Sequence, residues 1–153
     1  MSYINWDHSL QLGHPQIDAE HLGVLSRINA LVEIVFSEGR ELPELRCGES
    51  RRACIESAVD ALRAETAAHF QSEEGLMASV DFPGLKYHAE QHGELLTQLA
   101  NFADHYHSTN ADSLPHAVRF LREWFEFHVD TYDRALVRWL KTGDVTPPHL
   151  LDD

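Results

Sequence analysis

Histidine and carboxylate side chains recur at one-turn spacing in this sequence. The chain contains 11 histidines, and three of them belong to two such pairs, His69 with Glu73 and His88 with His92. A separation of four residues places both side chains on the same face of an α-helix, about 40° apart around its axis. Imidazole nitrogens and carboxylate oxygens are donors that suit iron, manganese and zinc, so the two pairs indicate metal binding.

Two further segments carry the same donor types. The first is residues 18–21, which end in His21, and the second begins at His128 and reaches Asp133 five residues later. Five residues advance about 140° on a regular α-helix, which would splay His128 and Asp133 apart. The sequence therefore predicts a local departure from α geometry there, such as a π-bulge. The alternative is a straight helix whose two side chains reach the metal from opposite flanks.

Each pattern is common by itself, and their combination carries the prediction. Several of these donors stand among apolar residues, where an unpaired polar group is costly, and a shared cation would satisfy them together. A carboxylate can bridge two ions, so a set of this size favours a pair of metals. The candidate ligands are His21, His69, Glu73, His88, His92, His128 and Asp133.

Helical periodicity covers most of the chain and places these donors. Apolar stripes at helical spacing predict helices over about 18–37, 49–79, 85–107 and 114–141, and no stretch alternates as a β-strand would. Short connections between long helices indicate an all-α fold, an antiparallel up-down four-helix bundle. We expect a single domain over 1–153, with an ordered N-terminal arm (1–17), the bundle (about 18–141) and an extended tail (142–153).

Composition excludes several classes of partner. The formal net charge of -13, from 25 acidic and 12 basic residues, argues against nucleic acid and membrane partners. Neither an apolar run of membrane-spanning length nor a secretory leader is recognisable, so a cytoplasmic location is expected. Cys47 and Cys54 would lie roughly 10 Å apart along a continuous helix, too far for a disulfide, so we expect free thiols.

The sequence resembles the hemerythrin family and, within it, the bacterial single-domain members, the bacteriohemerythrins. The resemblance rests on Ile17 to His21, His69-Phe-Gln-Ser-Glu73, Phe82-Pro83 followed by His88 and His92, and Trp124 to His128 with Asp133. It implies two non-haem iron ions, one bound by His88, His92 and His128 and the other by His21 and His69. Glu73, Asp133 and a solvent-derived oxygen would bridge them.

The resemblance also implies a pocket for dioxygen. Carried over by position, its walls would be Val24, Phe70, Trp124, Phe125, Val129 and Tyr132. A dry apolar cavity would keep water and protons from the open iron and slow its oxidation. Apolar residues at helical spacing are also what a bundle core needs, and both interpretations can hold together. The bulk of Phe125 and Tyr132 would partly fill such a cavity.

Reversible dioxygen binding is the function that the donor set favours, for a carrier, a store or a sensor. The alternatives are a diiron enzyme that consumes dioxygen, peroxide or nitric oxide, and an iron store. Enzymatic diiron bundles use more carboxylates, in Glu-x-x-His pairs, whereas five imidazoles outnumber two carboxylates here. We therefore expect a binding protein rather than an enzyme, and a sensor would need a separate protein partner.

The other histidines, and the glutamates next to candidate ligands, are expected on the surface. Glu74 and Glu90 neighbour candidate ligands but point off the ligand face on a regular helix, so we expect both to be solvated. The other histidines lack a helical partner at ligand spacing; they are His8, His14, His105, His107, His116 and His149.

Overall fold

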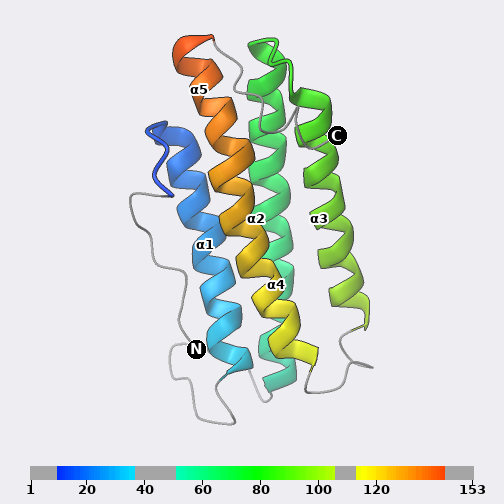
Figure 1. Ribbon diagram of the computed structural model, residues 1–153. Helices are drawn as coiled ribbons and strands as arrows, with labels where there is room; N and C mark the ends of the chain where they lie inside the picture. Colours follow the sequence, from blue (N-terminus) through cyan, green and yellow to red (C-terminus); the bar gives the residue numbers. More distant parts are fainter. Residues whose placement is uncertain (1–9, 37–50, 106–112, 144–153) are drawn as a thin grey trace.

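The computed structural model describes residues 10–36, 51–105 and 113–143. Figure 1 shows the helices in chain order. They are α1 (Pro15–Val35), α2 (Arg51–Ser79), α3 (Leu85–His105), α4 (Ser113–His128), the π-helix η2 (Val129–Asp133) and α5 (Arg134–Thr142). The predicted ends of the third helix, at 106–107, and of the tail, at 144–153, lie outside the described residues.

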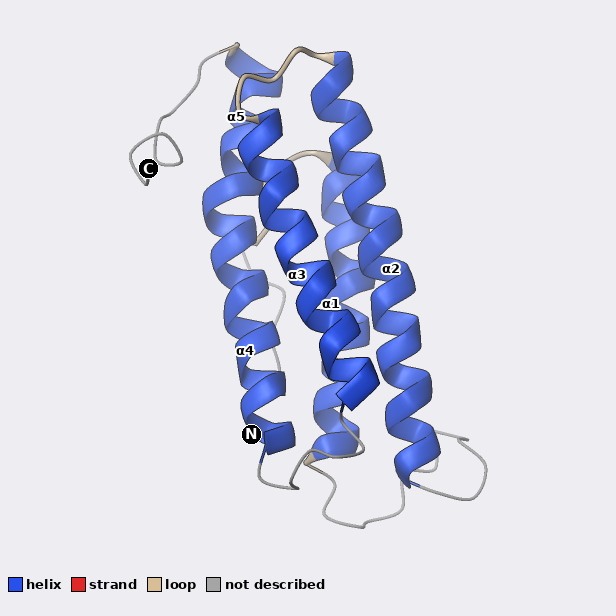
Figure 2. Cartoon of the chain, turned by 90° about the vertical axis from the view of Figure 1, so that its right-hand side faces the viewer, coloured by secondary structure: helices blue, strands red, loops and turns tan. Residues whose placement is uncertain are grey.

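Helices α1, α2 and α3 and the continuous helix formed by α4, η2 and α5 alternate in direction and pack side by side, as the two views show (Figures 1 and 2). This confirms the predicted antiparallel bundle. The stripe expected on the first helix faces the core: Val24, Leu25, Ile28, Leu31, Val32 and Val35 are all buried. Among the described residues, no helix is both long and apolar enough to cross a membrane.

Helix α1 begins at Pro15, three residues before its predicted start. Proline fits the first helical position because it has no N–H to leave unpaired, and His14 caps the helix by accepting from the Ile17 N–H at 3.2 Å. Asp18 accepts from the backbone N–H groups of Leu12 and Gly13 at 2.9 and 3.0 Å. The carboxylate of Asp18 therefore anchors the described end of the arm to the bundle.

A tight turn sets the register between α2 and α3. Asp81 adopts a left-handed conformation with φ of 52°, which aspartate tolerates better than most residues. The Phe82 N–H donates to the Met77 carbonyl at 3.0 Å, and the Trp139 indole N–H donates to the Val80 carbonyl at 3.1 Å. The second bond ties the turn to α5, and together the two bonds fix how the metal-donor side chains of α2 face those of α3.

The long helix at the C-terminal side is interrupted by one π turn, as predicted. The Arg134 N–H reaches the carbonyl of Val129, five residues earlier, within the π-helix that follows His128. Each residue of a π turn rotates by a smaller angle about the helix axis than a residue of an α turn. His128 and Asp133 therefore face the same side of the continuous helix formed by α4, η2 and α5. Gly143, in the left-handed conformation with φ of 68°, ends α5.

Cys54 corrects the prediction of free thiols. It is disulfide-bonded, and the described residues contain no free cysteine. The prediction assumed one continuous helix through both cysteines, but α2 begins only at Arg51. Cys47 itself lies outside the described residues.

Candidate metal centre

Seven polar side chains from five helical segments converge in the bundle core. They are the candidate ligands predicted from the sequence: His21 from α1, His69 and Glu73 from α2, His88 and His92 from α3, His128 from α4 and Asp133 from η2. None is more than 5% exposed. Their donor atoms form two groups with shared carboxylates, one of Glu73, His88, His92, His128 and Asp133, the other of His21, His69, Glu73 and Asp133.

Glu73 directs its two oxygens to different groups. Its Oε1 lies 2.9 Å from His88 Nε2 and 3.2 Å from His92 Nε2. Its Oε2 lies 3.1 Å from His69 Nε2. One carboxylate therefore presents an oxygen to the histidines of α3 and the other oxygen to the histidine of its own helix.

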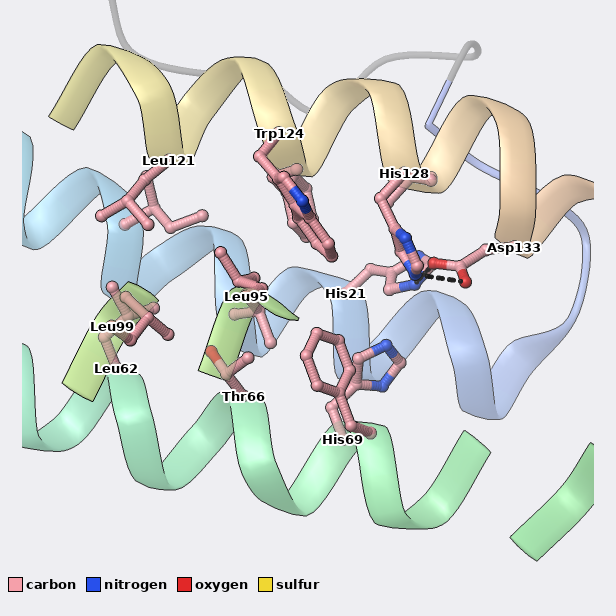
Figure 3. A pocket seen from close by; sticks show the side chains of 15 residues that line it. His21, Leu62, Thr66, His69, Leu95, Leu99, Leu121, Trp124, His128 and Asp133 are labelled. Carbon is pink, nitrogen blue, oxygen red and sulfur yellow. Dashed lines mark ion pairs between the residues drawn. The ribbon is translucent and has the colours of Figure 1, made fainter. Parts of the chain in front are cut away.

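Asp133 is divided in the same way. Its Oδ1 lies 2.9 Å from His88 Nε2 and 3.1 Å from His128 Nε2. Its Oδ2 lies 2.9 Å from His21 Nε2, the pair drawn as a dashed line in Figure 3. Both carboxylates thus stand between the two histidine groups, as bridging ligands must.

The imidazole nitrogens are spaced as donors around one ion would be. His128 Nε2 lies 3.2 Å from His88 Nε2 and 3.1 Å from His92 Nε2. Two donors at right angles on an ion with bonds of about 2.1 Å stand about 3.0 Å apart. Two imidazole nitrogens that face each other can share only one proton, whereas a cation could be coordinated by all three nitrogens. The donor set therefore fits a metal ion on this side.

The charges of the cluster also favour cations. Burial lowers the pKa of His21, but hydrogen bonds to Asp133 and Glu73 outweigh it and raise that pKa to about 10. His88 is affected in the same way, and its pKa rises to about 9. Burial opposes ionisation of Glu73, yet hydrogen bonds from the surrounding histidines hold its pKa well below the usual range. Without metal, protons on the imidazoles supply the positive charge that balances the buried carboxylates. Metal ions bound at the same place would supply that charge instead.

Two carboxylates lie at the outer nitrogens of candidate ligand imidazoles, and neither role was predicted from the sequence. Glu20 Oε1 lies 2.7 Å from His69 Nδ1, and Glu74 Oε2 lies 2.8 Å from His92 Nδ1. The prediction that Glu74 is merely solvated is therefore wrong; its side chain is 38% exposed but reaches across to α3. An imidazole that binds a metal needs an acceptor for its second nitrogen. The sequence could have indicated these two acceptors, because Glu20 directly precedes His21 and Glu74 directly follows Glu73.

Aromatic rings fix two of the imidazoles from the side. The ring of Phe70 stacks on His92 with centroids 3.7 Å apart and planes 3° apart. Trp124 stacks on His128 with centroids 4.4 Å apart and planes 12° apart. Stacking restricts ring rotation, so both Nε2 atoms stay aimed into the cluster.

A small, mostly apolar cavity of about 20 Å³ adjoins the cluster (Figure 3). It is large enough for one small molecule, since one water needs about 10–15 Å³ by the same measure. Its walls include five of the six residues expected around dioxygen, Val24, Phe70, Trp124, Phe125 and Val129, together with Ile28, Leu62, Thr66, Leu95, Leu99 and Leu121. From the cluster it meets His21, His69, His128 and Asp133.

Tyr132 does not line this cavity, which corrects its expected place. Its ring packs instead against His128 at 5.4 Å and His88 at 6.0 Å. The π turn directs Tyr132 to the three-histidine side of the cluster, away from His21 and His69. The cavity therefore keeps the space that a tyrosine would have filled.

A groove of about 330 Å³ between α3 and α4 shares two residues with the cavity. Phe102, Phe120 and His116 are among its walls, and Leu99 and Leu121 line both spaces. Two leucine side chains thus separate the groove from the inner cavity.

Of the histidines expected on the surface, two can be placed. His116 is exposed, whereas His14 is partly buried as the cap of α1. His8, His107 and His149, and the side chain of His105, lie outside the described residues. Glu90 is exposed, as expected.

Known proteins share both the sequence pattern and the fold of this chain. The family profile described as "Hemerythrin HHE cation binding domain" matches residues 12–140. The chain belongs to the hemerythrin family. Hemerythrins bind non-haem iron and dioxygen, and the buried cluster of histidines and carboxylates is the part of this chain that suits iron.

Hemerythrins from distant organisms are similar over most of their length. A bacteriohemerythrin of Ralstonia nicotianae is 29% identical over 140 residues, covering 92% of this chain and 90% of the relative. A myohemerythrin of Riftia pachyptila is 25% identical over 128 residues, covering 84% of this chain and 86% of the relative. A crystal structure of a leucine-to-phenylalanine mutant protein, 22% identical, aligns with a TM-score of 0.69 over 88% of this chain and 94% of the other, and supports the fold.

Proposed function

We propose that this hemerythrin binds two iron ions in the described cluster and takes up dioxygen reversibly beside His21 and His69, without turning it over. The ions would be held by the seven residues named above, with Glu73 and Asp133 as bridges. The observation that carries the proposal is the division of both carboxylates, each of which offers one oxygen to each histidine group. When bound, the iron pair supplies the electrons that dioxygen binding needs.

The two histidine groups differ in a way that selects the binding side. One group has five donors and the other four, so the ion beside His21 and His69 would keep an open position, as reactive metal sites do. The apolar cavity lies mainly on that side: both of its histidines, His21 and His69, line the cavity, whereas of the other three histidines only His128 does. An exogenous ligand would therefore meet the cluster from this cavity.

The walls of the cavity favour release of dioxygen unchanged. Val24, Phe125 and Val129 are 5% exposed or less, and none can donate a proton. Consumption of dioxygen requires protons delivered by a positioned acid. Apolar walls also keep out bulk water, which would speed oxidation of the iron.

Absorption spectroscopy on the iron-loaded protein tests this function. We expect elemental analysis to find two iron ions per chain. Reduced protein exposed to air should gain a visible charge-transfer band that disappears again under inert gas, over repeated cycles. One iron per chain would contradict the pair, and a band that bleaches after one cycle while an oxygen electrode records continued uptake would instead indicate an enzyme.

A further inference from the structure

Thr66 is a buried polar residue that the metal cluster does not use. It lies on α2 three residues before His69, and its side chain projects into the cavity (Figure 3). The residue is 2% exposed, and its Oγ1 has no hydrogen-bond partner. All other buried side-chain nitrogen and oxygen atoms without such a partner, within the described residues, belong to the candidate metal ligands.

The lack of a partner sets Thr66 apart from two other helical threonines of the described residues. Helical threonine commonly donates to the carbonyl four residues earlier. Thr97 does so to Gly93 at 3.0 Å, and Thr142 does so to Arg138 at 2.8 Å. Thr66 has the same helical option and does not take it, so its hydroxyl remains available to a molecule in the cavity.

The size and lining of the cavity determine what that molecule can meet. A space of about 20 Å³ admits one small occupant. Thr66 and His69 lie three residues apart on α2, and both line this space. Thr66 is the one residue of that lining with a hydroxyl; besides the candidate ligands, the only other lining residue with a polar side-chain group is Trp124, whose indole N–H can donate but not accept. A hydroxyl can both donate and accept a hydrogen bond, so an occupant with an acceptor atom would satisfy it.

We propose that the Thr66 hydroxyl donates a hydrogen bond to the small ligand that enters this cavity, and thereby favours ligands with an acceptor atom, such as azide or reduced dioxygen. Thr66 is then a specificity-determining residue on a mostly apolar wall. The inference deepens the proposed function and rests on it, because it presupposes that the ligand binds beside His21 and His69.

Azide titration of the oxidised, iron-loaded protein tests the role of Thr66. The variant Thr66→Val keeps the shape and removes the hydroxyl, and we expect its azide dissociation constant to rise about three- to tenfold, the effect of one lost hydrogen bond. Thr66→Ser keeps the hydroxyl and should stay within about twofold of the natural protein. Thr97→Val makes the same chemical change outside the cavity and should leave azide affinity unchanged.

A second measurement, on metal-free protein, excludes a structural explanation. Since the Thr66 hydroxyl has no partner in the protein, Thr66→Val should melt at the same temperature as the natural chain or higher. A clear loss of thermal stability would show that the hydroxyl has a protein partner, and would overturn the proposal.

The outcomes also separate this inference from the proposed function. Unchanged or tighter azide binding by Thr66→Val, with two iron ions present, would refute the hydrogen bond and leave the binding side intact. Tighter binding would mean that Thr66 held a water that azide must displace. Failure of the natural, iron-loaded protein to bind azide at all would refute the proposed function itself.

Discussion

The Nδ1 atom of His92 lies 2.8 Å from the Oε2 atom of Glu74, the residue directly after the carboxylate that stands between both histidine groups. Successive residues of α2 therefore serve different parts of one site. Glu73 points into the core, and Glu74 reaches outward to the back of an imidazole on α3. This contact orients the His92 ring and would increase its basicity if it binds a metal ion.

Removal of Glu74 should weaken iron binding on the three-histidine side. We expect Glu74→Ala to lower iron affinity about 10- to 100-fold, the usual effect of losing such a partner. Glu74→Gln retains an acceptor oxygen and should lose less. Competition with a chelator measures both. Glu90→Ala, which changes an exposed glutamate on α3, is the control, and equal affinities in Glu74→Ala and Glu90→Ala would show that the contact has no role.

Removal of Glu73 should have a larger effect than removal of Glu74. Glu73→Ala takes a buried anion from between two sets of histidines, so two cations would lose a shared counter-charge. We expect iron content well below two ions per chain and a lower melting temperature after iron reconstitution. Full iron content in Glu73→Ala would rule out a bridging role.

Deletion of Asp130 should leave the metal centre intact. Asp130 is the exposed residue of η2, and without it His128 and Asp133 would stand four positions apart, on one face of a regular α-helix. Its ion pair with Arg134 is exposed and contributes little. We expect two iron ions per chain and an unchanged or higher melting temperature.

The matched control is deletion of Glu126, an exposed residue of α4 one turn earlier. This deletion rotates His128 by about 100° around the helix axis relative to the buried Leu121. His128 would then no longer face the cluster, so iron should be lost. Iron loss in both deletion variants would mean that the π turn is required for more than alignment.

The metal-free protein should lose stability as the pH rises from about 7 to 10. His21 and His88 have folded-state pKa values of about 10 and about 9, above the ordinary value near 6.5. Their stabilising effect is complete below about pH 6.5 and is lost as the pH passes the folded values. Thermal unfolding in the presence of a chelator should show this decline, and His21→Asn should reduce its upper part. A melting temperature constant over this range would contradict the assignment of protons.

Truncation of Trp124 should speed oxidation without removing iron. Trp124 lines the cavity and stacks on His128, and Trp124→Ala would admit water to the ligand side. We expect several-fold faster loss of the oxygenated spectrum in air. Trp139→Ala removes a tryptophan that contacts the turn at Val80 and does not line the cavity; it should lower the melting temperature without changing the oxidation rate. Equal oxidation rates in natural protein and Trp124→Ala would show that the ring does not exclude water.

The sequence by itself determined the bundle and the donor set. Apolar stripes at helical spacing predicted the helices, and four-residue spacing put His69 with Glu73 and His88 with His92 on common faces. The five-residue interval from His128 to Asp133 also predicted the π turn that the structure contains. These features are local, because helical geometry follows from spacing along one segment.

Only the tertiary structure decided which residues meet across helices. The partners of Glu20 and Glu74 and the unpaired hydroxyl of Thr66 depend on how separate helices rotate against each other. A single helix face does not specify its neighbour's rotation, and packing of whole side-chain surfaces sets it. For the same reason, the sequence could name the candidate donors that converge in the core but not the second carboxylates beside them or the unpaired hydroxyl in the cavity.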